Sequence, residues 1–217
     1  MARTAVALPA DLLAAPSTGP NFLIEQHLGG VVCGIDEAGR GPWAGPVMAA
    51  AVVLDPGRVP VGINDSKKLS AAKREVLYGE ILGCAQVGIG EASVEEIDEL
   101  NILQATFLAM GRALGGLPTR PDHALVDGNR KPPLGIPATT VIKGDARSLS
   151  IAAASIIAKV FRDHRMTELA KIHPEYAWER NAGYGTAAHS RALAIVGLTP
   201  FHRRSFAPIR KLMTQES

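Results

Sequence analysis

The sequence predicts an α/β fold: a mixed β-sheet flanked by helices and followed by a helical C-terminal part. Apolar runs of strand length are interspersed with helical patterns up to residue 145, and helical patterns dominate the rest of the chain. The composition agrees, because 47% of the 217 residues are hydrophobic, enough to bury one sizeable core. We expect a flexible N-terminal tail at 1–26 and a single domain at 27–217 with a helical C-terminal extension.

The first two predicted strands cover residues 29–36 and 47–54. The loop between them is too short for a crossover helix, so the strands should pair antiparallel. The first strand runs into two adjacent carboxylates, Asp36 and Glu37. Neighbouring side chains on a regular strand face opposite sides. The two acids can therefore share one site only if the strand ends or twists near Asp36, and the glycines that follow favour such a break.

The middle of the chain adds a helix capped by Ser70, a third strand at 84–92 and a second helix at 94–114. Ser93 and Glu96 form a capping-box pattern at the start of the second helix. That helix returns the chain to the first strand.

Two further strands, at 123–128 and 138–145, end in Asp127 and Asp145. A long helix over 149–172 follows, and the remainder is loops and one or two short helices.

Charge and composition limit the protein class. The net charge is only +2, so any binding of nucleic acid must rely on local positive charge. Pro9 and Asp11 interrupt the apolar residues of a possible signal core, and no apolar run approaches the length of a membrane span. Cys33 and Cys84 are far apart in apolar runs, as expected for buried thiols in a reducing compartment. We expect a soluble, cytoplasmic protein.

Four acids directly follow strand patterns, and strand ends on one side of an α/β sheet converge on a shared crevice. Any one of them could instead be a turn former or a helix cap. Together they would repel one another, and a divalent cation removes that penalty. Ligands without histidine or thiolate favour Mg²⁺ or Mn²⁺, and paired ions of this kind act on phosphates. The four acids are Asp36, Glu37, Asp127 and Asp145.

The loop "GRGPWAG" at 39–45 does not contain a GxGxxG or a P-loop pattern. A dinucleotide-binding fold and a P-loop NTPase are therefore not supported. The loop is stiff, exposes backbone amides and carries one guanidinium, which suits close approach to a sugar–phosphate backbone. A plain tight turn is the alternative interpretation.

These motifs together resemble bacterial ribonuclease HII, the type 2 ribonuclease H family. The resemblance runs from about Val31 to Phe206 and rests on an ordered set of motifs: "GIDEAGRGPWAGPV", "NDSKKLS", "VDGN", "IKGDARSLSIAAASIIAKVFRDHRM", "NAGYGT" and "HRRSF". Ribonuclease HIII is similar but carries an extra N-terminal domain. Only about 30 residues precede the first predicted strand here, which favours type HII.

The resemblance implies a ribonuclease H-like fold and metal-dependent hydrolysis of the RNA strand of RNA–DNA hybrids. It also implies incision 5′ of single ribonucleotides embedded in duplex DNA, leaving 5′-phosphate and 3′-OH ends. Both duplexes are therefore the expected partners. No membrane partner is expected, and nothing demands more than a monomer.

The resemblance also assigns site residues. The four acids would be the catalytic metal ligands, with Mn²⁺ or Mg²⁺ bound, in a two-metal mechanism. Gly39, Arg40 and Gly41 would sense the ribose 2′-OH. Tyr184 would stack on the deoxyribose at the RNA–DNA junction.

Further polar residues are candidates for substrate binding: Lys67, Lys143, Ser155 and Lys159. For Lys67 a solvated surface charge is an equal alternative. Arg162 and Asp163 follow on the same helix, where an internal salt-bridge network is the alternative. His189 is a less favoured phosphate contact.

Two other functions fit parts of the pattern. A non-catalytic hybrid-binding protein could keep the fold, but clustered negative charge facing phosphates has no use in binding alone. Another acid-rich nuclease or a transposase of the same fold would not need a 2′-OH sensor such as the "GRG" loop.

Overall fold

The structure is a computed structural model that describes residues 8–9, 12 and 19–215. Its five-stranded sheet has the order β3-β2-β1-β4-β5. The strands are β1 (Val32–Ala38), β2 (Val47–Val53), β3 (Gln86–Ala92), β4 (His123–Asp127) and β5 (Ala138–Val141). β1 pairs antiparallel with β2 and parallel with β4, β2 pairs antiparallel with β3, and β4 pairs parallel with β5. The predicted mixed sheet is confirmed.

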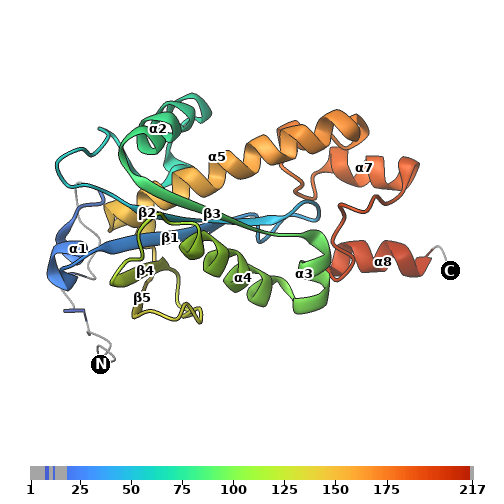
Figure 1. Cartoon of the computed structure of the whole chain (residues 1–217). Coiled ribbons are helices and arrows are strands. Elements are labelled where there is room, and N and C mark those ends of the chain that lie inside the picture. Colours follow the sequence, from blue (N-terminus) through green and yellow to red (C-terminus); the bar gives the residue numbers. More distant parts are fainter. Residues whose placement is uncertain (1–7, 10–11, 13–18, 216–217) are drawn as a thin grey trace.

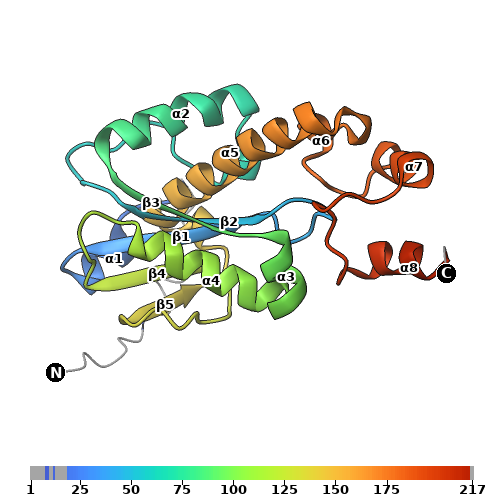
Figure 2. The same cartoon turned by 45° about the vertical axis from the view of Figure 1, so that its right-hand side comes forward.

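Helices cover both faces of this sheet. They are α1 (Leu23–Leu28), α2 (Ala71–Cys84), α3 (Val94–Leu100), α4 (Ile102–Gly115), α5 (Leu149–Ile172), α6 (Trp178–Asn181), α7 (Ala187–Val196) and α8 (Ala207–Gln215). Three 3₁₀ turns are η1 (Ser66–Lys68), η2 (Gly144–Ala146) and η3 (Pro174–Tyr176). Figures 1 and 2 show α2 and α5 on one face and α3 and α4 on the other, with α6, α7 and α8 beyond one end of the sheet.

Both faces of the sheet are buried because successive small side chains of β2 point to opposite faces. Ala49 and Ala51 lie in the apolar core on the α4 side, whereas Ala50 and Val52 lie in the core on the α5 side. On β1, a Cβ at Gly34 would lie 2.1 Å from the Ser150 carbonyl carbon of α5. Glycine there lets α5 pack directly on the strand. Both faces of the central strands are buried, which explains their continuous apolar runs.

The helix predicted over 94–114 is two helices. The capping box of Ser93 and Glu96 is present as predicted. At Asn101, however, φ is 71°, and its side chain accepts hydrogen bonds from the amides of Leu103 and Gln104. Asparagine tolerates this left-handed conformation better than most residues, so the chain bends and starts α4 anew.

The last part of the predicted tail belongs to the fold. Ile24 of α1 is buried with Leu125 and Val141. The Glu25 carboxylate accepts hydrogen bonds from the Ser148 hydroxyl (2.6 Å) and the Ser150 amide (3.0 Å) at the start of α5. These contacts hold α1 against the sheet, and most of the rest of the predicted tail lies outside the described residues. Among the described helices, none is long and apolar enough to cross a membrane.

Candidate active site

β1 continues past both acids, so the predicted break near Asp36 is absent. Asp36 is opposite Ala50 and Glu37 is opposite Ala49 on β2, and the pairing extends to Ala38. Because Ala50 faces α5 and Ala49 faces α4, the two acids lie on opposite faces of the sheet. The continuous ladder with β2 keeps the strand regular, and the acids straddle its end.

Asp127 and Asp145 come from the neighbouring edge. Asp127 is the last residue of β4, and its Oδ1 accepts a hydrogen bond from the Gly144 amide (2.7 Å). β5 stops at Val141, earlier than predicted, and Lys143 turns the chain with φ 54°. Asp145 therefore lies on the short turn η2, where it is buried.

The acids interact electrostatically. Burial raises the pKa of Asp36 well above its ordinary value, and the charges of Glu37, Asp127 and Asp145 raise it further. Burial also raises the pKa of Asp145, with Asp127 and Asp65 adding to the shift and Lys67 opposing it. These mutual charge effects show that Asp36, Asp127 and Asp145 lie near one another at this end of the sheet.

Glu37 has one satisfied and one orphaned oxygen. Its Oε1 lies 3.1 Å from Nη1 of Arg40, whereas its buried Oε2 has no hydrogen-bond partner among the described residues. Burial raises the pKa of Glu37, although the Arg40 guanidinium opposes this shift. A buried, unpartnered carboxylate oxygen is costly unless a ligand satisfies it.

The donor set fits a hard divalent cation. It consists of carboxylates that repel one another, and one of them carries an orphaned oxygen. In the described part of the chain, however, no three His, Cys, Asp or Glu side chains are gathered closely enough to hold a metal ion. Besides Arg40, Lys67 lies close to the acids, with Nζ 3.8 Å from Asp145 Oδ2 and its side chain 80% exposed. Burial lowers the pKa of Lys67, but the acids, led by Asp145, raise it by more.

A cavity of about 300 Å³ opens on the α5 side of the acids, and we call it the α5-side cavity. Its lining includes both β1 acids and most predicted substrate residues: Gly39, Arg40, Gly41, Lys67, Ser155, Lys159 and Tyr184. Ser155 is buried and Lys159 pairs with Asp163 (2.6 Å). Lys143 is different, because it is exposed and does not line this cavity.

A buried arginine, Arg203, holds the loop after β1 through hydrogen bonds on the buried side of the loop. Its guanidinium donates hydrogen bonds to the carbonyls of Gly39 (2.6 Å), Arg40 (3.1 Å), Gly45 (2.9 Å) and Pro46 (3.1 Å). Burial lowers its pKa to about 9, and the nearby Arg162 adds to the shift. Arg203 belongs to the "HRRSF" motif, but the sequence pattern alone did not indicate its role.

Arg162 forms a second support instead of the salt-bridge network considered above. It donates to the carbonyls of Pro46, Ala182 and Ala44, at 3.1, 3.0 and 3.2 Å. Burial lowers its pKa to about 10. A signal existed in the sequence, because Arg162 lies four residues from the buried Ala158 and Met166, on the buried face of α5.

The Tyr184 ring lies against this loop. A Cβ at Gly41 would be 3.4 Å from Tyr184 Cε1, and Tyr184 is 50% exposed. Gly39 has φ 98°, and a Cβ there would lie 1.9 Å from Nε of Arg162. Glycine at position 39 is therefore required by both the backbone and the space.

His189 does not face phosphate, because it is fully buried. The Thr199 amide donates to Nδ1 of His202 (3.0 Å), which leaves the proton of that ring on Nε2. His202 Nε2 then donates to His189 Nε2 (2.9 Å), and His189 Nδ1 donates to the Tyr184 carbonyl (3.0 Å). Burial lowers the pKa of both histidines, that of His202 to about 4. This neutral pair fixes the backbone of Tyr184.

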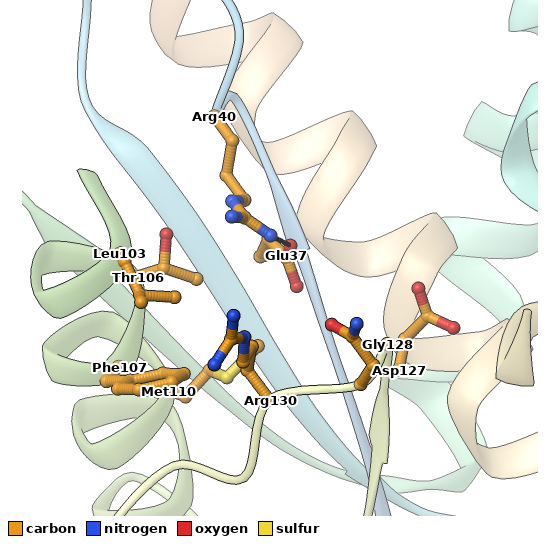
Figure 3. Close-up of a pocket in the computed structure, with 10 residues that line it drawn as sticks. Glu37, Arg40, Leu103, Thr106, Phe107, Met110, Asp127, Gly128 and Arg130 are labelled. Carbon is orange, nitrogen blue, oxygen red and sulfur yellow. Dashed lines mark hydrogen bonds and ion pairs between the residues drawn. The ribbon is translucent and has the colours of Figure 1, made fainter. Parts of the chain in front are cut away.

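A larger cavity, of about 410 Å³, opens on the opposite side of β1, and we call it the α4-side cavity. Glu37 and Arg40 border it as well as the α5-side cavity. Figure 3 shows it between α4 and the turn after β4, with Asp127 pointing away toward α5. The residues of this turn, Asn129 and Arg130, were not among the predicted site residues.

Comparisons with known proteins agree on one family. Residues 33–209 match the family model described as Ribonuclease HII. A protein named Ribonuclease HII from Jannaschia sp. (strain CCS1) is 65% identical over 196 residues, which cover 90% of this chain and 98% of that protein. The chain is similar to the ribonuclease H2 crystal structure from Pyrococcus horikoshii OT3, with a TM-score of 0.71, 27% identity, and coverage of 85% of this chain and 97% of that one. The fold also matches Bst-RNase HIII in complex with Mn²⁺, with a TM-score of 0.70, 20% identity, and coverage of 89% and 72%.

Proposed function

The chain belongs to the ribonuclease HII family, and from this membership we propose that it incises duplex DNA on the 5′ side of a single embedded ribonucleotide. The products would carry 5′-phosphate and 3′-OH ends. As a ribonuclease H, the protein cleaves the RNA strand of RNA–DNA hybrids in a metal-dependent reaction. One observation carries the finer proposal: the Gly41 backbone and the Tyr184 ring meet in the same cavity as Asp36 and Glu37.

The loop 39–41 suits recognition of a 2′-OH, the group that separates RNA from DNA. Arg203 occupies the carbonyls of Gly39 and Arg40 from the buried side. The exposed side of the loop is left to face the substrate, and a rigid backbone can hold donors and acceptors at fixed positions. A deoxynucleotide at this place would leave the contact to the 2′-OH unmade.

Tyr184 suits the nucleotide on the 3′ side of the ribonucleotide. Its half-exposed ring lies beside Gly41, one step along the cavity from the loop. An aromatic face packs favourably on a deoxyribose, whereas a 2′-OH in that position would be desolvated without a partner. Loop and ring together would read a ribo-to-deoxy step.

We assign the metal ligands to the four acids, Asp36, Glu37, Asp127 and Asp145. When bound, divalent ions supply positive charge to the attacking and leaving oxygens of phosphodiester hydrolysis. Bst-RNase HIII, which shares this fold, is known in complex with Mn²⁺, and we propose Mn²⁺ or Mg²⁺ as the ion here. The repulsion among the acids and the orphaned Glu37 oxygen support the same assignment.

The predicted basic and polar residues differ in how close they lie to the acids, and we propose a different contact for each. Lys67 would bind the phosphate at the acids, and the position of its ammonium near Asp145 supports this role. Lys159 and Ser155 face the same α5-side cavity and would position the strand. Lys143 lies outside that cavity, so it would reach only a phosphate elsewhere on the duplex. A monomer located in the cytoplasm stays a prediction of the sequence.

The test uses duplex DNA with one internal ribonucleotide and, in parallel, an all-RNA hybrid, each with Mn²⁺ or Mg²⁺. We expect incision at the 5′ side of the ribonucleotide. Tyr184→Ala should lose the preference for the single-ribonucleotide substrate, and Tyr184→Phe, which keeps the ring, should retain it. Absence of incision at the ribonucleotide by the wild-type protein, with the hybrid still cut, would overturn the proposal. Tyr184→Ala with the wild-type substrate ratio would overturn the role of the ring.

A further inference from the structure

The α4-side cavity is separate from the α5-side cavity but touches the same catalytic end of β1. Glu37 and Arg40 form the common border of the two cavities. The border arises because β1 stays regular through Ala38 and projects Glu37 toward α4 while Asp36 faces α5. A strand bound across the acids would therefore have a cavity on either side of them.

The α4-side cavity contains an available positive charge. Arg130 is exposed and lines it together with the acids Glu37 and Asp127. Its guanidinium nevertheless forms no ion pair or hydrogen bond with any residue that the structure describes. Arg40, by contrast, is paired with Glu37. An unpaired guanidinium beside catalytic acids is suited to a phosphate of the substrate.

Opposite this charge, α4 supplies an apolar wall. Figure 3 shows Arg130 reaching from the turn after β4 toward Phe107 and Met110 of α4. Phe107 is half-buried, so part of its ring remains accessible, and Leu103 lies one turn before it. An aromatic or aliphatic surface facing a guanidinium offers a place for a sugar or base next to a place for its phosphate.

The 5′-to-3′ direction of the bound strand indicates which nucleotide occupies the α4-side cavity. On the proposed function, which this inference rests on, the ribonucleotide and its 3′ neighbour occupy the α5-side cavity, at the loop 39–41 and Tyr184. The cleaved bond lies 5′ of the ribonucleotide, at the acids. The α4-side cavity opens on the far side of β1 from these contacts, so it is available to the part of the strand that lies 5′ of the cleaved bond.

We infer that the α4-side cavity binds the deoxynucleotide on the 5′ side of the cleaved bond, the one released with the 3′-OH. Arg130 binds the phosphate on the 5′ side of this nucleotide, and the partly exposed ring of Phe107 contacts its sugar or base. The cavity holds the leaving group in line while the α5-side cavity reads the sugar type. Arg130 contributes to binding of every substrate and not to the choice between ribose and deoxyribose.

The experiment combines protein and substrate changes. Single-ribonucleotide duplexes carry one neutral methylphosphonate, placed in turn at each of several phosphates on both sides of the cleaved bond and on the complementary strand. They are cut by the wild-type protein, Arg130→Ala, and Lys131→Ala as a matched control. Lys131 is the adjacent exposed cation, and it does not line the cavity. Because Arg130 is exposed, its replacement leaves the fold intact, which thermal unfolding checks.

We expect Arg130→Ala to raise KM about tenfold, the size of a lost charge-assisted hydrogen bond, and to reduce the salt dependence of binding. The methylphosphonate at the first phosphate 5′ of the cleaved one should impair the wild-type protein and Lys131→Ala equally. The same methylphosphonate should not raise the KM of Arg130→Ala any further. Arg130→Lys should recover part of the binding.

Two outcomes would overturn the inference. One is that Arg130→Ala cuts all substrates like Lys131→Ala. The other is that Arg130→Ala becomes insensitive to a methylphosphonate placed 3′ of the cleaved bond or on the complementary strand. Arg130 would then bind that phosphate, and the cavity would have a different occupant. Both outcomes are measured with substrates that the wild-type protein incises at the ribonucleotide. A wild-type protein that fails to incise there contradicts the proposed function instead.

Discussion

The Nε2 atoms of His189 and His202 lie 2.9 Å apart, joined by one proton inside a buried aromatic cluster. Tyr176 and Trp178 pack on these rings, and His173 is the further titratable ring in the cluster. The hydrogen-bond chain through the pair ends at the carbonyl of Tyr184. The residue proposed to read the junction is thus held by two histidines that must both stay neutral.

This pair predicts a loss of stability in acid. Burial lowers the pKa of His202 to about 4 in the folded state, against about 6.5 when unfolded. Between pH 4 and pH 6.5 the unfolded chain binds more protons than the folded protein. The contribution of neutral His202 to the free energy of unfolding is therefore fully present above pH 6.5 and is lost as the pH falls toward 4. The expected loss at pH 5 is about 2 kcal/mol.

The measurement is urea unfolding of the wild type and His202→Gln at pH 7.5 and pH 5. The glutamine can still donate to His189 but does not titrate in this range. We expect the variant to be less stable at pH 7.5 and the gap to narrow at pH 5. The exposed His27→Gln serves as the control and should show no such narrowing. A constant gap for His202→Gln would contradict the neutral pair.

A second prediction compares two glycines of one loop. Gly39→Ala forces a Cβ into the Arg162 side chain at a φ of 98°, so it should destabilise the fold by about 2 kcal/mol or more. Gly41→Ala meets only the edge of Tyr184 at 3.4 Å. It should fold normally and change the preference for the ribo-to-deoxy step. Thermal unfolding and the ratio of the two substrates separate these effects, and equal stability of both variants would argue against the close contact at Gly39.

A third prediction concerns Asp36. Burial and neighbouring charges raise its pKa, so its ionised form is unfavourable when no cation is bound. Asp36→Asn keeps the oxygen that accepts from the Glu37 amide. In chelator, the variant should therefore be more stable than the wild type by about 1 kcal/mol, although it loses turnover. Added Mn²⁺ should raise the melting temperature of the wild type more than that of the variant.

The exposed Glu99→Gln is the charge control for this comparison. It removes the same charge at a distance from the acids and should change neither stability nor the response to Mn²⁺. If Asp36→Asn were the less stable protein in chelator, mutual repulsion among the acids would not be the dominant force at the site.

A fourth prediction tests the support of the loop. Arg203→Met would leave several buried carbonyls without donors, at a cost of about 3 kcal/mol or more. Arg204→Met, at the next position, removes an exposed side chain and should stay within about 0.5 kcal/mol of the wild type. Chemical unfolding measures both. A cost for Arg203→Met no larger than that for Arg204→Met would show that the four hydrogen bonds contribute little.

The sequence by itself determined the strands, the long helix and the acids at the strand ends. These features depend on local patterns: apolar runs bound strands, Ser93 and Glu96 cap a helix, and Asp127 directly follows a strand pattern. The ordered motifs also identified the family, because several short motifs in one order are far more specific than any one of them.

Tertiary structure alone decided how these parts meet. The ladder between β1 and β2 keeps Glu37 on the α4 face and thereby divides the site into two cavities. Arg203 binds the carbonyl of Gly39 across 164 residues. Neither contact has a local signature, because register and long-range hydrogen bonds depend on the packing of the whole chain. A strand pattern shows where Asp36 and Glu37 occur, but only the assembled sheet determines which way each of them points.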